Sequence, residues 1–124
     1  MVLDDEESIR SLLQEGLRAH GLDVACAATA DEAAALITAR PCDALLCDLR
    51  LKGANSLSDG KAAAAHVLSA AGAQKPVVIF MTGEFVDQNS KLAGVSLLQK
   101  PFRMLDVLAV MKEAFVFAKQ GTEK

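Results

Sequence analysis

The chain has 124 residues, a length typical of one domain, and 52% of them are hydrophobic, which excludes a disordered chain. Its 13 basic and 16 acidic residues give a net charge of −3, which argues against a nucleic-acid-binding domain because such domains are basic. The longest mostly apolar stretch, residues 76–81, is too short to span a membrane, and no signal peptide precedes the first acidic residues. We therefore expect a cytoplasmic domain without a membrane segment.

The first part of the chain alternates short apolar runs with stretches of helical spacing. We expect strands at 1–3, 23–27 and 43–48, and helices at 6–20 and 30–40. Negative charge at the start of the first helix suits the helix dipole, and residues 29–32, Thr-Ala-Asp-Glu, form a capping box for the second. The three cysteines (Cys26, Cys42 and Cys47) have neither disulfide nor zinc spacing, so we interpret them as buried thiols.

The second part continues the alternation after a long polar loop at 49–60. Helices are expected at 61–71 and 103–119, strands at 77–82 and 96–99, and at most a short helix at 87–93. In the last helix, Leu105, Met111 and Phe115 recur at helical spacing and are predicted to be core residues. Residues 1–120 then form one domain, and 121–124 are expected to fray.

Strands that alternate with helices five times indicate an α/β fold. Such a pattern predicts one parallel sheet with right-handed crossovers and helices on both faces. The carboxyl ends of all its strands lie on one edge, where ligands of open α/β sheets bind.

Polar residues stand at the ends of these strands. Asp4 and Asp5 follow the first strand, Asp48 ends the third, Thr82 ends the fourth and Lys100 follows the fifth. Three neighbouring carboxylates repel one another unless a cation lies among them, and oxygen ligands without His or Cys indicate Mg²⁺. An ion, an ammonium and a hydroxyl around Asp48 suit phosphoryl transfer onto that carboxylate, which is already ionised and needs no general base. Both histidines, His20 and His66, lie in helices and are interpreted as structural.

The ordered set of motifs resembles a response-regulator receiver domain of bacterial two-component signalling. It comprises residues 3–6 (Leu-Asp-Asp-Glu), the strand-terminal Asp48, residues 82–84 (Thr-Gly-Glu) and residues 100–102 (Lys-Pro-Phe). The resemblance spans essentially the whole chain. It implies the flavodoxin-like, doubly wound fold with five parallel strands in the order 2-1-3-4-5.

The resemblance also implies roles for the metal-binding residues. Asp48 would be the phosphoacceptor, and Asp4 and Asp5 would hold Mg²⁺ or Mn²⁺, with Asp5 the more direct ligand. Arg50 would give its backbone carbonyl to the metal. A histidine kinase or a histidine phosphotransfer protein would supply the phosphoryl group.

For the phosphoryl group itself, the resemblance implies that Lys100 pairs with it and that the Thr82 hydroxyl moves toward it. The bond from Lys100 to Pro101 would be cis. The family often has an aromatic residue three positions before this lysine, and here that position is Leu97, so the usual threonine–aromatic switch would lack its aromatic side chain.

Two other departures concern loops. The segment 49–60 is longer than usual and lacks the family's Met-Pro, and the segment 82–100 is short, so the helix at 87–93 is reduced or irregular. That helix, the strand at 96–99 and the last helix form the family's usual signalling face, through which a homodimer would form. No direct nucleic-acid binding is expected.

The sequence is also compatible with two other functions. The first is a receiver fold used only for docking and never phosphorylated. The second is a metal-dependent phosphatase with Asp48 as nucleophile, which normally needs a second acid two positions on, where this chain has Arg50. The sequence also fits either a stand-alone receiver or one part of a longer regulator.

Overall fold

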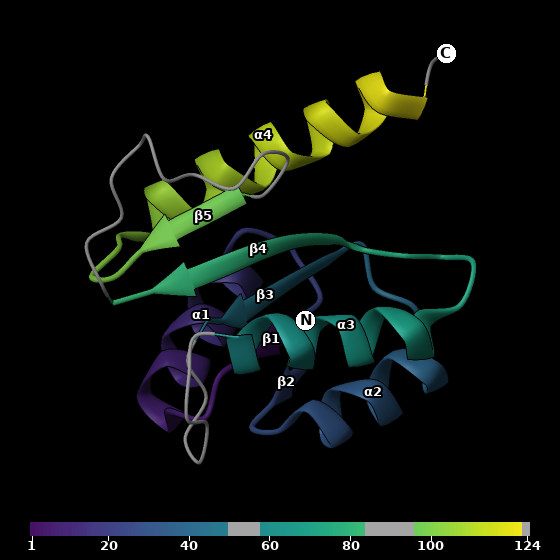
Figure 1. The fold of residues 1–124 in the computed structure, drawn as a ribbon. Coiled ribbons are helices and arrows are strands. Elements are labelled where there is room, and N and C mark those ends of the chain that lie inside the picture. The colour runs from purple at the N-terminus through teal and green to yellow at the C-terminus, as the bar shows by residue number, and fades with distance from the viewer. Residues whose placement is uncertain (50–57, 84–95, 123–124) are drawn as a thin grey trace.

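Five short parallel strands form a single sheet in the order β2-β1-β3-β4-β5 (Figure 1). This computed structural model describes residues 1–49, 58–83 and 96–122. In chain order its elements are β1 (Val2–Leu3), α1 (Glu7–Ala19), β2 (Cys26–Ala27), α2 (Ala30–Ala39), β3 (Ala44–Asp48), α3 (Ser58–Ala71), β4 (Val77–Thr82), β5 (Ser96–Gln99) and α4 (Met104–Thr122). The predicted α/β fold and strand order are confirmed.

The sheet is covered by helices on both faces, and each face has its own hydrophobic core (Figure 1). Helices α2 and α3 pack on one face, against strand residues such as Leu45 and Phe80. Helices α1 and α4 pack on the other, against Leu46 and Ile79. Successive strand residues point to opposite faces, so the apolar residues of β3 contribute side chains to both cores, and all of β3 is buried.

Helix α2 begins where the capping box predicts. The Thr29 hydroxyl accepts a hydrogen bond from the Glu32 backbone N–H at 3.2 Å. The Glu32 carboxylate in turn accepts from the Ala28 N–H at 3.4 Å, one residue before the position that a capping box usually uses. These two hydrogen bonds fix the first turn of α2.

The structure corrects several expectations. Helix α3 begins at Ser58, so Gly60 lies in its first turn and not in the loop, and α4 continues past the predicted end to Thr122. Leu105 is 71% exposed and Phe115 is 38% exposed, so neither is a core residue. Over residues 104–116 of α4, the part whose burial is described, Val107 and Ala114 are buried. The helix expected at 87–93 lies outside the described residues.

Within the described part of the chain, no helix has the length and hydrophobicity that crossing a membrane requires.

Candidate functional site

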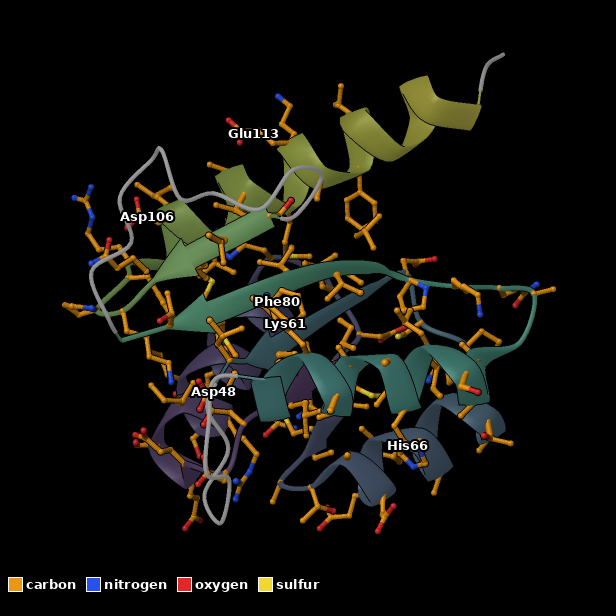
Figure 2. All side chains as sticks on the ribbon, viewed as in Figure 1. Asp48, Lys61, His66, Phe80, Asp106 and Glu113 are labelled. Carbon is orange, nitrogen blue, oxygen red and sulfur yellow. The ribbon has the colours of Figure 1, made fainter. Side chains whose placement is uncertain are left out.

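The strand-terminal residues meet at the carboxyl edge of the sheet. Asp48 ends β3, where its register partner on β4 is Met81, and Thr82 follows as the last residue of β4. Lys100 follows β5, and its backbone N–H donates to the Thr82 carbonyl at 2.7 Å, which joins the ends of these two strands. Figure 2 shows Asp48 at this edge and His66 on α3 away from it.

Three carboxylates form an acidic cluster at this edge, consisting of Asp4, Asp5 and Asp48. One oxygen of each lies within 4.8 Å of the others. Asp4 is fully buried and Asp48 is 6% exposed, whereas Asp5 is partly exposed. Water therefore screens the repulsion between the two buried carboxylates poorly, and a compensating positive charge is required.

Lys100 provides one such charge. Its Nζ lies 3.0 Å from Oδ2 of Asp4 and 3.6 Å from Oδ1 of Asp48. Burial lowers the pKa of this amine, but the hydrogen bond to Asp4 and the charges of Asp4, Asp48 and Glu6 together outweigh burial and raise the pKa above its ordinary value. Lys100 is thus a fixed cation beside the phosphoacceptor candidate at neutral pH.

Two further contacts fix Asp4, and the one from Arg10 could not be predicted from the sequence. Its Oδ1 accepts from the Glu6 backbone N–H at 2.9 Å, so that its carboxylate stabilises the start of α1. The side chain of Arg10 donates to the Asp4 carbonyl at 2.8 Å. An arginine one turn into an amphipathic helix gives no sequence signal for such a role.

The fifth strand places Leu97 beside a phenylalanine. Leu97 is partly buried and is the register partner of Phe80, which is 7% exposed and lies two residues before Thr82. Thr82 itself is 3% exposed. The bond between Lys100 and Pro101 is cis. Arg50 lies outside the described residues.

The backbone that follows Asp48 is held by β4 and by α3. The N–H of Leu49 donates to the Met81 carbonyl at 2.8 Å, and the carbonyl of Leu49 accepts from the Gly60 N–H at 3.1 Å. The Cys47 thiol, fully buried, lies 3.5 Å from the carbonyl oxygens of both Asp48 and Gly60. The first turn of α3 is therefore bonded directly to the end of β3.

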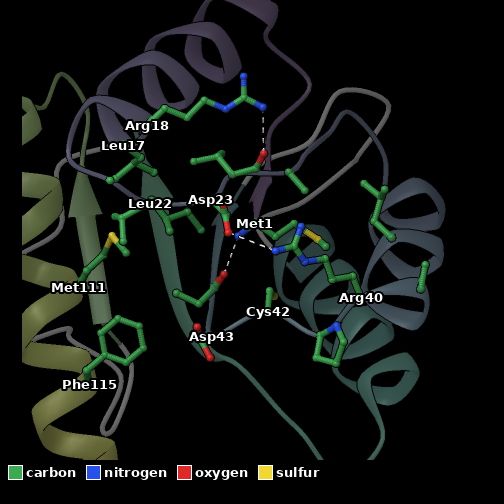
Figure 3. A pocket seen from close by; sticks show the side chains of 18 residues that line it. Met1, Leu17, Arg18, Leu22, Asp23, Arg40, Cys42, Asp43, Met111 and Phe115 are labelled. Atoms are coloured by element: carbon green, nitrogen blue, oxygen red, sulfur yellow. Dashed lines mark hydrogen bonds and ion pairs between the residues drawn. The ribbon is translucent and has the colours of Figure 1, made fainter.

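A hollow of about 680 Å³ lies elsewhere, at the amino ends of the first three strands (Figure 3). Apolar side chains such as Leu22, Met111 and Phe115 line it, with the exposed ion pair of Arg40 and Asp23 at its side. Parallel sheets bind ligands at the opposite, carboxyl edge, where the acidic cluster lies. We therefore take the acidic cluster, and not this hollow, as the candidate site.

The donor set of the acidic cluster fits a magnesium ion. All three candidate ligands are carboxylate oxygens, from Asp4, Asp5 and Asp48, and among the described residues no other group of three or more His, Cys, Asp or Glu side chains could hold a metal. Mg²⁺ prefers oxygen ligands and binds through one or two carboxylates together with water and phosphate oxygens. Lys100 contacts two of these three carboxylates, Asp4 at 3.0 Å and Asp48 at 3.6 Å, so its charge lies at the edge of the same cluster.

The fold and this edge define a class of protein: a receiver domain, the signalling switch of two-component systems. The chain belongs to that family, because the model of the response regulator receiver domain matches residues 1–112. The expectation from the sequence motifs is thereby confirmed.

Individual relatives agree with this assignment. The chain is 29% identical over 129 residues to a putative response regulator, NtrX-like, from Rickettsia typhi, covering 99% of this chain and 26% of that protein. The receiver domain of NtrX from Brucella abortus superposes with a TM-score of 0.73 at 26% identity, covering 93% and 96% of the two chains. Vibrio cholerae chemotaxis protein CheY4 shares the fold, with a TM-score of 0.73 at 21% identity over 91% and 94%. The chain spans about a quarter of the length of the curated relative.

Proposed function

We propose that this domain is a phosphorylatable receiver in which Asp48 accepts a phosphoryl group in the presence of Mg²⁺ or Mn²⁺. The observation that carries the proposal is the position of Lys100, whose amine lies 3.0 Å from Asp4 and 3.6 Å from Asp48 inside the acidic cluster. A docking module has no need of a partly buried cation beside two buried carboxylates, since such an arrangement costs desolvation energy.

In the proposed reaction an Asp48 oxygen attacks phosphorus directly. The new bond is between that oxygen and phosphorus, and the bond that breaks joins phosphorus to the donor, which is a histidine nitrogen or the acyl oxygen of a small phosphodonor. A bound divalent ion would neutralise charge on the phosphoryl oxygens. Lys100 then stabilises the same charge from the other side, and the Thr82 hydroxyl donates to a phosphoryl oxygen.

Lys100 would change partners during this reaction. Before transfer its amine neutralises Asp4 and Asp48, and after transfer the phosphoryl oxygens offer it more negative charge than either carboxylate alone. Movement of Lys100 and Thr82 toward the new group would pull on the ends of β5 and β4, which their backbone hydrogen bond joins. Phe80 and Leu97 are register partners on β4 and β5, a short distance before Thr82 and Lys100. A movement of the strand ends would therefore pass through a leucine beside a phenylalanine, where the family often has an aromatic residue in place of Leu97.

The proposed donor is a histidine kinase or a histidine phosphotransfer protein in the cytoplasm. We place the output face, including any homodimer contact, on β5 and α4, where Leu105, Phe115 and Val116 are exposed. The domain itself would show only slow phosphorylation from small phosphodonors and slow loss of the phosphoryl group. We assign residues 1–120 to it.

Intact-protein mass spectrometry after incubation with acetyl phosphate and Mg²⁺ tests the proposal. We expect a mass gain of one phosphoryl group that disappears on alkaline treatment, as an acyl phosphate requires, and that is absent with a chelator or in Asp48→Asn. Asp43→Asn is the matched control, because Asp43 is an exposed acid just before the same strand. Binding of Mg²⁺ without any mass gain would contradict the proposal and favour the docking module.

A further inference from the structure

Gly60 lies in an unusual place for a glycine, within the first turn of α3. Glycine weakens a helix by about 1 kcal/mol relative to alanine, so a buried glycine in a helix usually serves close packing. A Cβ atom at this position would lie 2.5 Å from both the Cα and the carbonyl carbon of Leu49, and closer still to the Leu49 carbonyl oxygen. These are backbone atoms, which cannot rotate away as the end of a side chain can.

The atoms in contact with Gly60 are those next to the proposed phosphoacceptor. Leu49 follows Asp48 directly, and its carbonyl accepts the Gly60 N–H at 3.1 Å. The Cys47 thiol reaches the Gly60 carbonyl at 3.5 Å from the strand residue just before Asp48. Gly60 therefore contacts the chain on both sides of Asp48, once through its N–H and once through its carbonyl.

We propose that Gly60 is a positioning residue that fixes the backbone on either side of Asp48 and thereby sets the geometry of metal binding and phosphoryl transfer. The inference rests on the proposed function of Asp48. An unstrained contact between a carbon and a carbonyl oxygen needs about 3.3 Å, so a side chain at residue 60 displaces α3 or Leu49 by roughly 1 Å. Mg²⁺ tolerates little distortion of its octahedral ligands, and a 1 Å misplacement of a reacting group can cost about 100-fold in rate.

Gly60→Ala tests this inference, and Gly16→Ala is its matched control. Gly16 is also a helical glycine, on α1, but a Cβ there meets the side chain of Met104, whose flexible end can move aside. The measurements are the Mg²⁺ dissociation constant by titration calorimetry, the rate of phosphorylation by acetyl phosphate at saturating Mg²⁺, and the melting temperature. We expect Gly60→Ala to bind Mg²⁺ at least about tenfold more weakly and to react at least about tenfold more slowly, while Gly16→Ala stays within about twofold of the wild type.

The melting temperature separates positioning from mere stability. A purely structural role for Gly60 would lower the melting temperature and leave the Mg²⁺ affinity of the folded protein unchanged, and that result overturns the inference. If Gly60→Ala fails to fold, the Mg²⁺ affinity of Cys47→Ala tests the inference in its place. It removes the thiol contacts to the carbonyl oxygens of Gly60 and Asp48 and leaves Gly60 itself in place, so we expect about threefold weaker Mg²⁺ binding, and unchanged binding overturns the inference.

The two proposals fail in different ways. A wild-type protein that neither binds Mg²⁺ nor gains a phosphoryl group overturns the proposed function and this inference with it. An active wild type beside an equally active Gly60→Ala protein overturns this inference alone.

Discussion

Lys100 and Asp4, 96 residues apart in sequence, form an ion pair of 3.0 Å in which Asp4 is fully buried and the lysine side chain is 16% exposed. A partly buried pair of this kind contributes little net stability by itself, but the loss of Lys100 leaves the charge of Asp4 buried and uncompensated. The ion pair joins the residue after β1 to the residue after β5. The stability of the folded protein should therefore fall when Lys100 alone is replaced.

Lys100→Met should destabilise the metal-free protein by about 3 kcal/mol, because Asp4 and Asp48 then lose their nearby cation. Urea unfolding in the presence of a chelator measures this free energy of unfolding. Lys75→Met is the control: Lys75 is an exposed lysine after α3, and its replacement should cost less than about 0.5 kcal/mol. Equal losses for the two variants would contradict the prediction.

The pH dependence of the same pair follows from the raised pKa of Lys100. A raised pKa means that the folded state binds this proton more tightly than the unfolded state does. The stabilisation is thus complete below the ordinary value of 10.5 and is lost as the pH rises through the higher folded value. The difference in unfolding free energy between wild type and Lys100→Met, measured with a chelator, should stay constant from about pH 6 to pH 9 and shrink only above that range. A difference that instead grows as the pH rises toward 10.5 would mean that the unfolded state holds this proton more tightly, and would show that the pKa is lowered in the folded protein.

Asp48→Asn should have opposite effects with and without metal. Without metal, it removes one of three crowded carboxylates and should stabilise the protein by about 1 kcal/mol. With Mg²⁺ at about 100 times its dissociation constant, the wild type should gain about 2.7 kcal/mol by binding linkage, and the variant much less. Thermal unfolding with chelator and with Mg²⁺, beside the Asp43→Asn control, separates the two effects. Identical Mg²⁺ responses of variant and wild type would show that Asp48 is not part of a metal site.

The sequence predicts that the strand-terminal acids and Lys100 lie at one edge of the sheet, and the structure brings them together there because their positions depend on topology. Once the strands are assigned, the parallel order alone brings the residues after β1 and at the end of β3 to one edge. By contrast, most residues in the sequence of α4 are apolar, so helical spacing fits several faces equally well. Leu105 fits the predicted spacing and is exposed, while Val107 is fully buried. The packing of Gly60 against Leu49 gives no periodic pattern at all and becomes visible only in the structure.

Cys47 should be the least reactive of the cysteines. Burial, followed by the charges of Asp48 and Asp4, raises the pKa of its thiol to about 12, and its side chain is fully buried. Cys26 and Cys42 are partly exposed, and burial raises the pKa of each as well. Since only the thiolate reacts quickly, iodoacetamide at about pH 8 should modify Cys42 and Cys26 slowly and Cys47 more slowly still.

Peptide mapping by mass spectrometry over a time course measures this order of reactivity. Urea provides the control, because all three thiols should react at similar rates once the chain unfolds. Modification of Cys47 as fast as Cys42 in the folded protein would mean that β3 opens frequently next to Asp48.

Leu105 and Val107, two positions apart on α4, provide a direct test of which face of this helix is buried. Val107→Ala removes two methyl groups from a fully buried side chain in the core shared with α1, and it should cost about 2 kcal/mol of unfolding free energy. Leu105→Ala removes more carbon from a side chain that is 71% exposed, and it should change stability by less than about 0.5 kcal/mol. Urea unfolding of both variants under the same conditions measures the contrast. If Leu105→Ala costs as much as Val107→Ala, then Leu105 is covered in solution, for example by the second subunit of a homodimer, and the cost should then depend on protein concentration.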